Sequence, residues 1–414
     1  MTDKQKKAVI FAPFWRQAGH VGNNRVDRFV RWLFEAGYFV VIIRAGGADG
    51  ERPEPWGEEI TIRDPLGFYR DVGLNGKQPV ARKPNKLRRS LSYWFFNPDP
   101  TVVWARLAAK HPMVIQASKG ASFVLSSSPP ESSHFGAWKL SQCLKIPHLV
   151  DMRDGWLDEP LKPLLRSSAL RRWQEGRMEA RILRDATVIQ VTSDVWQELL
   201  CQRLPELSAK VKVLTNGYPQ HVPEKIKAEG PVVKDSLLLI HAGRFLGSRL
   251  TQRPELLLQP LLEAVSKQSC TGVIQLLGNL SSEELVLIDR FKVPFAEHGW
   301  TIDCPGSLQR QELLQRLPQA DGLLLLSASY AAIPSKLFEY IPTGKPIFVV
   351  TEKNSATWRI CEELPQATLL DIFVEKNSYP ATQQPFYLKS QYTILPEFHE
   401  SYLRQQFVRL LSCR

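Results

Sequence analysis

Lys336 and Glu339 stand three positions apart in the segment from Ile333 to Ile347, and their side chains could bind two parts of one ligand. Pro334 predicts a loop that leads into a short helix, on which residues three apart share a face. A carboxylate on that face can accept hydrogen bonds from two ribose hydroxyls, and an ammonium can bind a phosphate. The pair therefore predicts a nucleotide-sugar site. The alternative, without a ligand, is a solvated ion pair on a surface helix.

The elements around this pair place it at the end of a strand. The apolar run at residues 322–326 predicts a buried strand before the pair, and residues 347–350 predict the next strand after it. Gly344 is expected to end the short helix between them. Open parallel sheets bind ligands at the carboxyl ends of their strands, so we expect Lys336 and Glu339 to face a ligand there.

The sequence Pro334-Ser335-Lys336-Leu337-Phe338-Glu339-Tyr340, followed by Gly344-Lys345-Pro346, resembles the C-terminal domain of the group 1, family 4 glycosyltransferases. The resemblance implies that Glu339 binds the donor ribose, and that Pro334, Ser335, Lys336 and Leu337 lie against the donor. In that family this glutamate is the second acid of a pair spaced eight residues apart. Ala331 stands at the position of the first acid here, so that contact to the donor sugar is not carried over. Hydroxyls close by in the sequence are those of Ser327, Ser329 and Tyr330.

A second group of candidates, Gly243 and Arg244, directly follows the strand expected at residues 236–242, and Arg249 lies five positions beyond Arg244. In the resembled family a Gly-Arg pair and a second cation at this place neutralise the donor diphosphate, which implies this role for Arg244 and Arg249. Without a metal, the charge of a leaving group must be met by such cations and by helix N-termini. No Asp-x-Asp in a strand-loop context is present to hold Mg²⁺, so we expect neither a metal nor a cofactor.

Gly278 and Leu308 complete the donor-binding candidates of the second half. Gly278 forms a turn after the strand expected at residues 273–277. Leu308 lies in the segment 305–317, which is expected to form a loop and a helix. In the resembled family, the corresponding segment lies against the nucleotide base. The second half thus supplies candidates for the phosphates, the ribose and the base.

The first half opens with a strand, a glycine-containing loop and a helix. Residues 8–14 form an apolar run, and apolar positions three and four apart predict an amphipathic helix at 25–35, before a second strand at 38–43. Gly22 and Asn23 lie in the loop between them, where helix N-terminal amides can face a phosphate. The alternative is that glycine is needed there only for the backbone geometry of a tight turn. In the resembled family, the corresponding loop faces the donor phosphates and the acceptor.

Two further motifs each follow an expected strand, at residues 123–126 and 148–150. The first is Ser-Ser-Pro-Pro with His134 shortly after it, and the second is Asp-x-Arg-Asp-x-Trp, whose second acid is Asp154. Both occur in a subset of the resembled family, and they make His134 and Asp154 candidates for catalysis on the acceptor side. The alternative for Asp154 is a helix cap or a local ion pair.

Composition and charge narrow the class of protein. The chain has 414 residues, 43% of them hydrophobic and 23% charged, which excludes a wholly disordered or fibrous protein and allows two or three domains. Its six cysteines are scattered without a zinc or redox spacing, which indicates a reducing compartment. No apolar run reaches the length of a membrane span or signal peptide, so we expect a cytoplasmic protein. The net charge of +11 favours an anionic partner.

The segment 82–96 combines a basic cluster with Tyr93, Trp94, Phe95 and Phe96. Such a mixture can dock on an acidic membrane, which would place the protein at the inner face of the membrane as a peripheral protein. It can also stack on nucleic acid, a role that only the charge supports. The alternative is a solvated loop that leads into a buried aromatic patch.

These observations predict an α/β protein of GT-B fold, with two Rossmann-like, doubly wound parallel-sheet domains that face each other across a cleft. Residues 1–218 are expected to form the acceptor-binding domain and 219–235 the linker. Residues 236–396 are expected to bind the nucleotide-sugar, and 397–414 to form a helix that crosses back to the N-terminal domain.

The implied activity is transfer of a sugar from a nucleotide-sugar to a glycan or lipid-linked acceptor, with retention and without metal, in polysaccharide or glycoconjugate biosynthesis. One alternative is a nucleotide-sugar epimerase or a hydrolase on the same fold. Another is a non-catalytic protein in which Ala331 marks lost chemistry and the basic surface binds a membrane or a partner.

Overall fold

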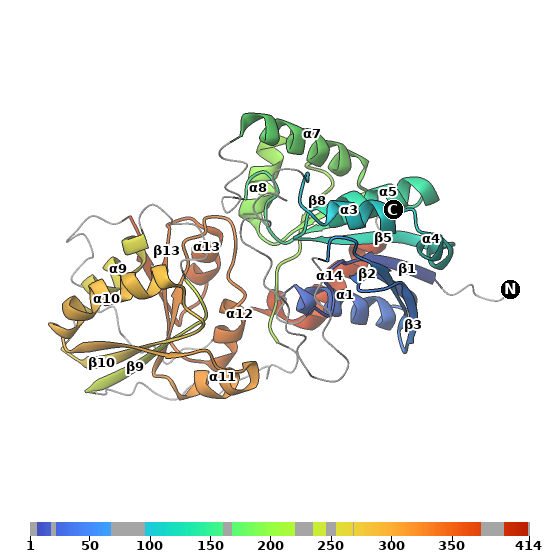
Figure 1. Ribbon diagram of the computed structural model, residues 1–414. Helices are drawn as coiled ribbons and strands as arrows, with labels where there is room; N and C mark the ends of the chain where they lie inside the picture. The colour runs from blue at the N-terminus through green and yellow to red at the C-terminus, as the bar shows by residue number, and fades with distance from the viewer. Residues whose placement is uncertain are drawn as a thin grey trace. The chain divides into compact units, whose positions relative to one another are not determined.

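The computed structural model describes residues 6–17, 22–67, 96–159, 168–219, 235–245, 254–267, 269–373 and 393–412. Contacts divide the chain into two compact units (Figure 1). The first comprises Met1–Thr192, Trp196–Leu214 and Arg404–Arg414, and the second comprises Thr215–Leu403 together with Ser193–Val195. Arg249, most of the expected linker 219–235 and nearly all of the segment 82–96 lie outside the described residues.

The first unit is built on a sheet of eight strands in the order β3-β4-β2-β1-β5-β6-β7-β8. The strands are β1 Lys6–Phe11, β2 Tyr38–Gly46, β3 Gly50–Glu54, β4 Gly57–Arg63, β5 Ala121–Ser128, β6 His148–Met152, β7 Val188–Val191 and β8 Val211–Val213. Neighbouring strands run parallel, except that β3 is antiparallel to β4 at the edge. The strand order reverses its direction between β1 and β5, which makes that point the topological switch of the sheet.

Helices connect these strands on the two faces of the first sheet. They are α1 Asn23–Glu35, α3 Val102–Ala108, α4 Pro112–Ser118, α5 Ser132–Leu144, α7 Ala169–Asp185 and α8 Asp194–Arg203, with a 3-10 turn at Pro205–Leu207. Strands β1 and β2 carry apolar residues on both faces because helices cover both sides. Phe11 packs against Trp104 of α3 with ring centroids 5.1 Å apart, in a core that α3, α4 and α5 close.

The second unit contains a six-stranded, wholly parallel sheet in the order β11-β10-β9-β12-β13-β14. The strands are β9 Ser236–Ala242, β10 Thr271–Leu277, β11 Trp300–Gly306, β12 Gly322–Leu326, β13 Ile347–Thr351 and β14 Ala367–Asp371. The connecting helices are α9 Gln259–Ser266, α10 Ser282–Ala296, α11 Arg310–Arg316, α12 Leu337–Tyr340 and α13 Ala356–Glu362. Short 3-10 turns lie at Pro254–Leu257, Leu317–Gln319, Ile341–Thr343 and Pro396–Phe398. The switch point of this sheet lies between β9 and β12.

The last helix, α14 Glu400–Ser412, packs on α1 through its second half. Phe407 is fully buried and stacks on Phe29, with ring centroids 4.9 Å apart. Arg404 also forms an ion pair with Glu35 at the end of α1. Arg404–Arg414 therefore belongs to the first unit, although the chain before it belongs to the second.

The predicted fold class, two doubly wound parallel sheets, is confirmed. The strands expected at 236–242 and 322–326 have those bounds in the structure, and Gly344 adopts the left-handed conformation of a helix end with φ of 70°. The sequence pattern predicted no strand at residues 50–63, which form the hairpin of β3 and β4. Its glutamates and Pro53 lie on an exposed edge, where the apolar alternation that marks a strand is weak. No helix in the described part of the chain has both the length and the apolar character needed to cross a membrane.

Candidate functional site

The site expected in the second unit lies at the switch point between β9 and β12. Gly243 and Arg244 follow β9 directly, and the segment that carries Lys336 and Glu339 follows β12. The two loops meet, because Lys336 Nζ donates a hydrogen bond to the backbone oxygen of Arg244 at 3.1 Å. The chemistry-bearing residues of two distant segments therefore share the edge of the sheet at which parallel α/β sheets bind their ligands.

Lys336 is the half-buried cation of this site. Its Nζ lies 3.1 Å from Nε2 of His241, whose Nδ1 lies 2.8 Å from the carbonyl oxygen of Leu324. Because that carbonyl can only accept, Nδ1 carries the proton and Nε2 accepts from the lysine. Burial lowers the pKa of His241 well below 6.5, which keeps the imidazole neutral as this arrangement requires.

Burial also lowers the pKa of the Lys336 ammonium to about 8, while the nearby carboxylates Glu284 and Glu339 oppose that shift. The two carboxylates therefore offset only part of the free energy that burial costs the charged ammonium. An anion bound at Nζ would supply the missing compensation, as a phosphate does. This is the electrostatic feature of the second unit that points most directly to an anionic ligand.

Glu284 is a residue that sequence reasoning missed. Its side chain is fully buried at the start of α10, where one oxygen accepts from the amide of Phe245 at 2.7 Å and the other from the amide of Ser281 at 2.7 Å. Arg244 Nε lies 3.3 Å from the same carboxylate. Ser281 and Glu284 form a capping box, a pattern visible in the sequence that predicts a helix start but not an anchor for the loop after β9. Glu284 holds that loop, and with it Arg244, in place.

Two glycines allow the loops to approach closely. Gly243 has φ of +83° and its amide donates to the oxygen of Leu277 at 2.6 Å. A Cβ on Gly278 would lie 2.9 Å from backbone atoms of Gly243, so a larger residue there would push the loop after β9 away. The structure brings the two predicted glycines together, and Gly243 lies beside Lys336.

Glu339 lies in α12, the short helix that Tyr340 ties to the end of β9. The Tyr340 hydroxyl accepts from the amide of Ala242 at 2.7 Å, and burial raises the pKa of this phenol. Glu339 Oε1 forms an ion pair with Arg310 of α11 at 2.8 Å, where the Arg310 side chain is 58% exposed and that of Glu339 is 16% exposed. A ligand that donated hydrogen bonds to Glu339 would meet this exposed guanidinium as well.

The remaining donor candidates differ in exposure. Leu308 is partly exposed in the loop between β11 and α11, Pro334 is partly exposed and Ser335 is exposed. The Leu337 side chain is buried, and its amide donates to the oxygen of Pro334 at 3.0 Å. Ala331 is buried as well. Ser327, one of the hydroxyls considered in its place, is buried with no hydrogen-bond partner for Oγ among the described residues.

In the first unit, Gly22 and Asn23 lie at the start of α1, next to the switch point between β1 and β5. A Cβ on Gly22 would lie 1.6 Å from Nη1 of Arg153, so the guanidinium occupies the space that only glycine leaves. Arg153 donates to the backbone oxygens of Ser128 and Pro129 at 2.6 and 2.7 Å. Gly22, Asn23 and Arg153 line a small hollow at this edge.

A buried ion pair connects the start of α1 to the end of β6 at that edge. Arg25 donates to Asp151 with the closest contact at 2.7 Å, and Ser127 donates to the other oxygen of this carboxylate at 2.7 Å. Arg25 also donates to the backbone oxygen of Leu214 at 2.8 Å. The sequence placed both residues in notable segments but gave no sign that they pair, because 126 positions separate them.

His134 lies in the interior. Its side chain has no exposed surface, and its Nδ1 lies 2.7 Å from Ser126 Oγ, which also lies 2.8 Å from Nε2 of His148. Trp156 packs nearby, with ring centroids 6.0 Å apart. A fully buried imidazole cannot reach a substrate in this conformation, so we assign His134 a structural role. Asp154 is partly exposed, two residues from the end of β6, and it counteracts the burial that lowers the pKa of Arg153.

No cluster of three or more His, Cys, Asp or Glu side chains that could hold a metal ion occurs within the described ranges. Two unit-internal sites thus emerge, each at the switch point of its own sheet. The first is lined by Gly22, Asn23 and Arg153, and the second by Gly243, Arg244, Gly278 and Lys336.

Comparison with known proteins gives the class that this architecture defines. Solved structures of similar fold include Anabaena HepE in complex with UDP and glucose, which is 14% identical, with a TM-score of 0.56 over 99% of this chain and 100% of that one. An α,α-trehalose-phosphate synthase (UDP-forming) from Burkholderia vietnamiensis is 12% identical, with a TM-score of 0.58 over 99% and 100%. Sucrose-phosphate synthase from Thermosynechococcus elongatus is 14% identical, with a TM-score of 0.53 over 99% and 90%. The chain has the GT-B fold of these glycosyltransferases.

The first unit also matches a known family. The match is to the family described as the glycosyl transferase 4-like domain, and it covers residues 22–217, just under half of the chain. No curated protein matches the chain by sequence. The resemblance seen in the sequence motifs is thereby confirmed at the level of the fold, and the family match over residues 22–217 agrees with it.

Proposed function

We propose that this chain transfers a sugar from a nucleoside diphosphate sugar, with UDP as the nucleotide, to a hydroxyl group of a glycan or lipid-linked acceptor in glycoconjugate biosynthesis. The observation that carries the proposal is Lys336, an incompletely compensated ammonium beside the backbone of Arg244 at the switch point of a wholly parallel sheet. The complex of the structural neighbour HepE with UDP and glucose supports the choice of donor.

In the proposed reaction, the bond between the anomeric carbon and the diphosphate oxygen breaks, and its electron pair leaves on the diphosphate. Lys336 and Arg244 meet the charge that develops there, and Glu284 holds Arg244 in position. The acceptor oxygen forms its bond to the anomeric carbon on the same face, and its proton passes to an oxygen of the departing phosphate. Configuration is retained, and no resident metal ion has a role in the step.

Glu339 is proposed to bind the ribose hydroxyls of the donor. Its ion pair with Arg310 orients the carboxylate before the donor arrives. Ala331, at the place of the first acid of the family pair, leaves the sugar end without a carboxylate contact at that position. The contacts proposed for the donor are therefore those to its diphosphate and its ribose.

A second candidate function is nucleotide-sugar binding without catalysis. Ala331 favours it, because the residue at this position contributes no charged or hydrogen-bonding side chain to the donor sugar. Hydrolysis or epimerisation of the donor on the same fold is a third reading. These readings differ in their products, since only the transferase forms a bond between donor sugar and acceptor.

The experiment measures UDP release from a panel of UDP-sugars, with and without glycan and lipid-linked acceptors, and identifies the product by NMR at its anomeric carbon. Arg244→Ala is expected to lower turnover about a hundredfold, because a charge-stabilising donor is lost. Arg290→Ala, which removes an exposed arginine of α10, is the matched control and should leave turnover unchanged. Binding of UDP without any turnover would favour the non-catalytic reading, and free sugar or epimer as the product would replace transfer.

A further inference from the structure

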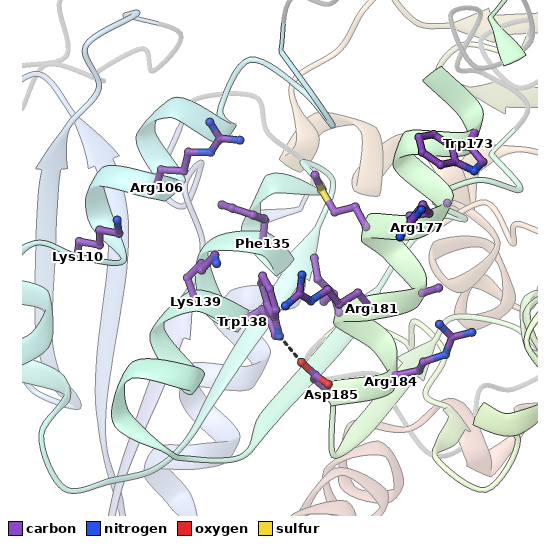
Figure 2. Close-up of a pocket in the computed structure, with 14 residues that line it drawn as sticks. Arg106, Lys110, Phe135, Trp138, Lys139, Trp173, Arg177, Arg181, Arg184 and Asp185 are labelled. Atoms are coloured by element: carbon purple, nitrogen blue, oxygen red, sulfur yellow. Dashed lines mark hydrogen bonds between the residues drawn. The ribbon is translucent and has the colours of Figure 1, made fainter. Parts of the chain in front are cut away.

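A groove on the first unit lies between α5 and α7, with α3 along its edge, and its side chains are unusually basic (Figure 2). It has a volume of about 1070 Å³, the upper end of the range for small-molecule sites, so it has room for several units of a chain-like ligand. The basic residues that line it are Arg106, Lys110, Lys139, Arg177, Arg181 and Arg184.

Acidic side chains of the described residues neutralise little of the positive charge of this groove. The lining described contains one acid, Asp185, which accepts a hydrogen bond from Trp138 Nε1 at 2.8 Å, and Arg184 pairs with Glu206 outside the groove. The other five cations have no carboxylate partner among the described residues. Several like charges gathered in one hollow repel each other, and an anionic ligand relieves that repulsion.

Aromatic rings hold these cations in place. Lys139 Nζ lies 4.5 Å and the Arg181 guanidinium 5.1 Å from the ring centroid of Trp138, and Arg177 lies 5.0 Å from that of Trp173. Because cations already lie over these rings, the groove presents charge rather than bare aromatic faces. That arrangement favours a ligand held through its acidic groups over a nucleic acid held by base stacking.

The spacing of the charges along α7 indicates a linear ligand. Arg177 and Arg181 are four residues apart on the helix, a rise of ~6 Å, and Lys139 faces them from α5 (Figure 2). Phe135 and Trp138 are largely buried in α5, and the cations lie over their rings. A groove of this volume between two helices can hold a single chain.

We propose that this groove is a binding site for a linear acidic glycan, one that carries a carboxylate or phosphate on successive sugars. The anionic character of the ligand follows from the groove itself, and the choice of a glycan over other polyanions rests on the proposed function. The groove belongs to the first unit and the donor site to the second, and the groove would hold acidic sugars of the acceptor chain. Removal of its cations should therefore affect a long acidic acceptor but not the binding of UDP.

The test measures binding of oligogalacturonate to the full chain by calorimetry, with a neutral maltooligosaccharide of equal length for comparison. Wild-type protein should bind the acidic chain, with an affinity that falls as salt rises, and should not bind the neutral one. The double variant Arg177→Gln/Arg181→Gln should lose about tenfold or more in affinity, because two charge-assisted contacts are removed. The control Arg172→Gln/Lys212→Gln removes two exposed cations of the same unit outside the groove and should stay within about twofold of wild type.

Equal binding of the acidic and neutral chains, or unchanged binding by the groove variant, would overturn the proposal. The proposal would also be overturned if oligogalacturonate did not bind while phosphatidylglycerol vesicles or single-stranded DNA bound in a way that depends on Arg177 and Arg181. UDP binding, measured on every variant, shows that the protein is folded. If wild-type protein neither bound UDP nor transferred a sugar, the proposed function would be refuted. Binding of oligogalacturonate would still stand as a separate result.

Discussion

Raising the pH from 7 to 9 is expected to weaken UDP binding about tenfold, because unliganded Lys336 loses its proton in this range. The ammonium lies half-buried against His241 and the backbone of Arg244, and its pKa is lowered to about 8. A phosphate bound at Nζ favours the charged form and raises that pKa again. UDP binding above pH 8 must therefore include the uptake of a proton.

The magnitude follows from the fraction of molecules whose lysine is charged. With a pKa of about 8, about nine in ten molecules carry the charge at pH 7 and about one in ten at pH 9. Affinity follows that fraction as long as bound UDP keeps the lysine charged. The His241 imidazole does not contribute, because its pKa is far below this range.

The assay is calorimetric titration with UDP from pH 6.5 to 9.5, on wild type, on Lys336→Met and on the control Lys353→Met, which removes an exposed lysine of the same unit. Lys336→Met should bind weakly with an affinity that does not change with pH, and the control should behave as wild type. An affinity for UDP that is constant across this range in wild type would refute the reasoning about Lys336.

Other perturbations test the rest of the structure. The unliganded protein should gain stability relative to Lys336→Met between pH 8 and 10.5 in thermal unfolding, because the unfolded chain binds more protons there; a constant difference would contradict the lowered pKa. Glu284→Ala should lower the free energy of unfolding by about 2–4 kcal/mol and reduce turnover, since it frees the loop that carries Arg244; urea titration measures the first effect, and unaltered stability would remove the anchor role. Glu339→Gln should weaken UDP binding while the melting temperature stays within a few degrees of wild type, and equal affinity would remove the ribose assignment. Gly22→Ala should displace the Arg153 guanidinium and destabilise the first unit by roughly 1–3 kcal/mol, whereas a neutral effect would show that this edge can relax.

The sequence was most informative where a local pattern carries the structure. The apolar runs at β9 and β12, the proline before Lys336 and the left-handed Gly344 are all short-range features, and they sufficed to predict the strands and loops of the second site. The doubly wound fold followed from the alternation of strands and helices. The hairpin of β3 and β4 escaped prediction because its exposed edge residues are charged and contain proline.

What could not be predicted are the contacts between residues distant in sequence. Nothing local links Arg25 to Asp151, or Glu284 to the loop after β9, because each pair meets only once the sheet has formed. His134 shows the converse case, since its motif suggested a catalytic group and its side chain is buried in the fold. The basic groove was missed for the same reason, since its charges come from three helices that are far apart in the chain.

The most direct test of the central claim is a crystal structure of the protein soaked with UDP. We predict that the diphosphate lies between the loop after β9 and the start of α12, with an oxygen within hydrogen-bonding distance of Lys336 Nζ and the ribose hydroxyls on Glu339. Clear density for UDP at any other place, with Lys336 still donating to His241 and to the backbone oxygen of Arg244, would contradict it.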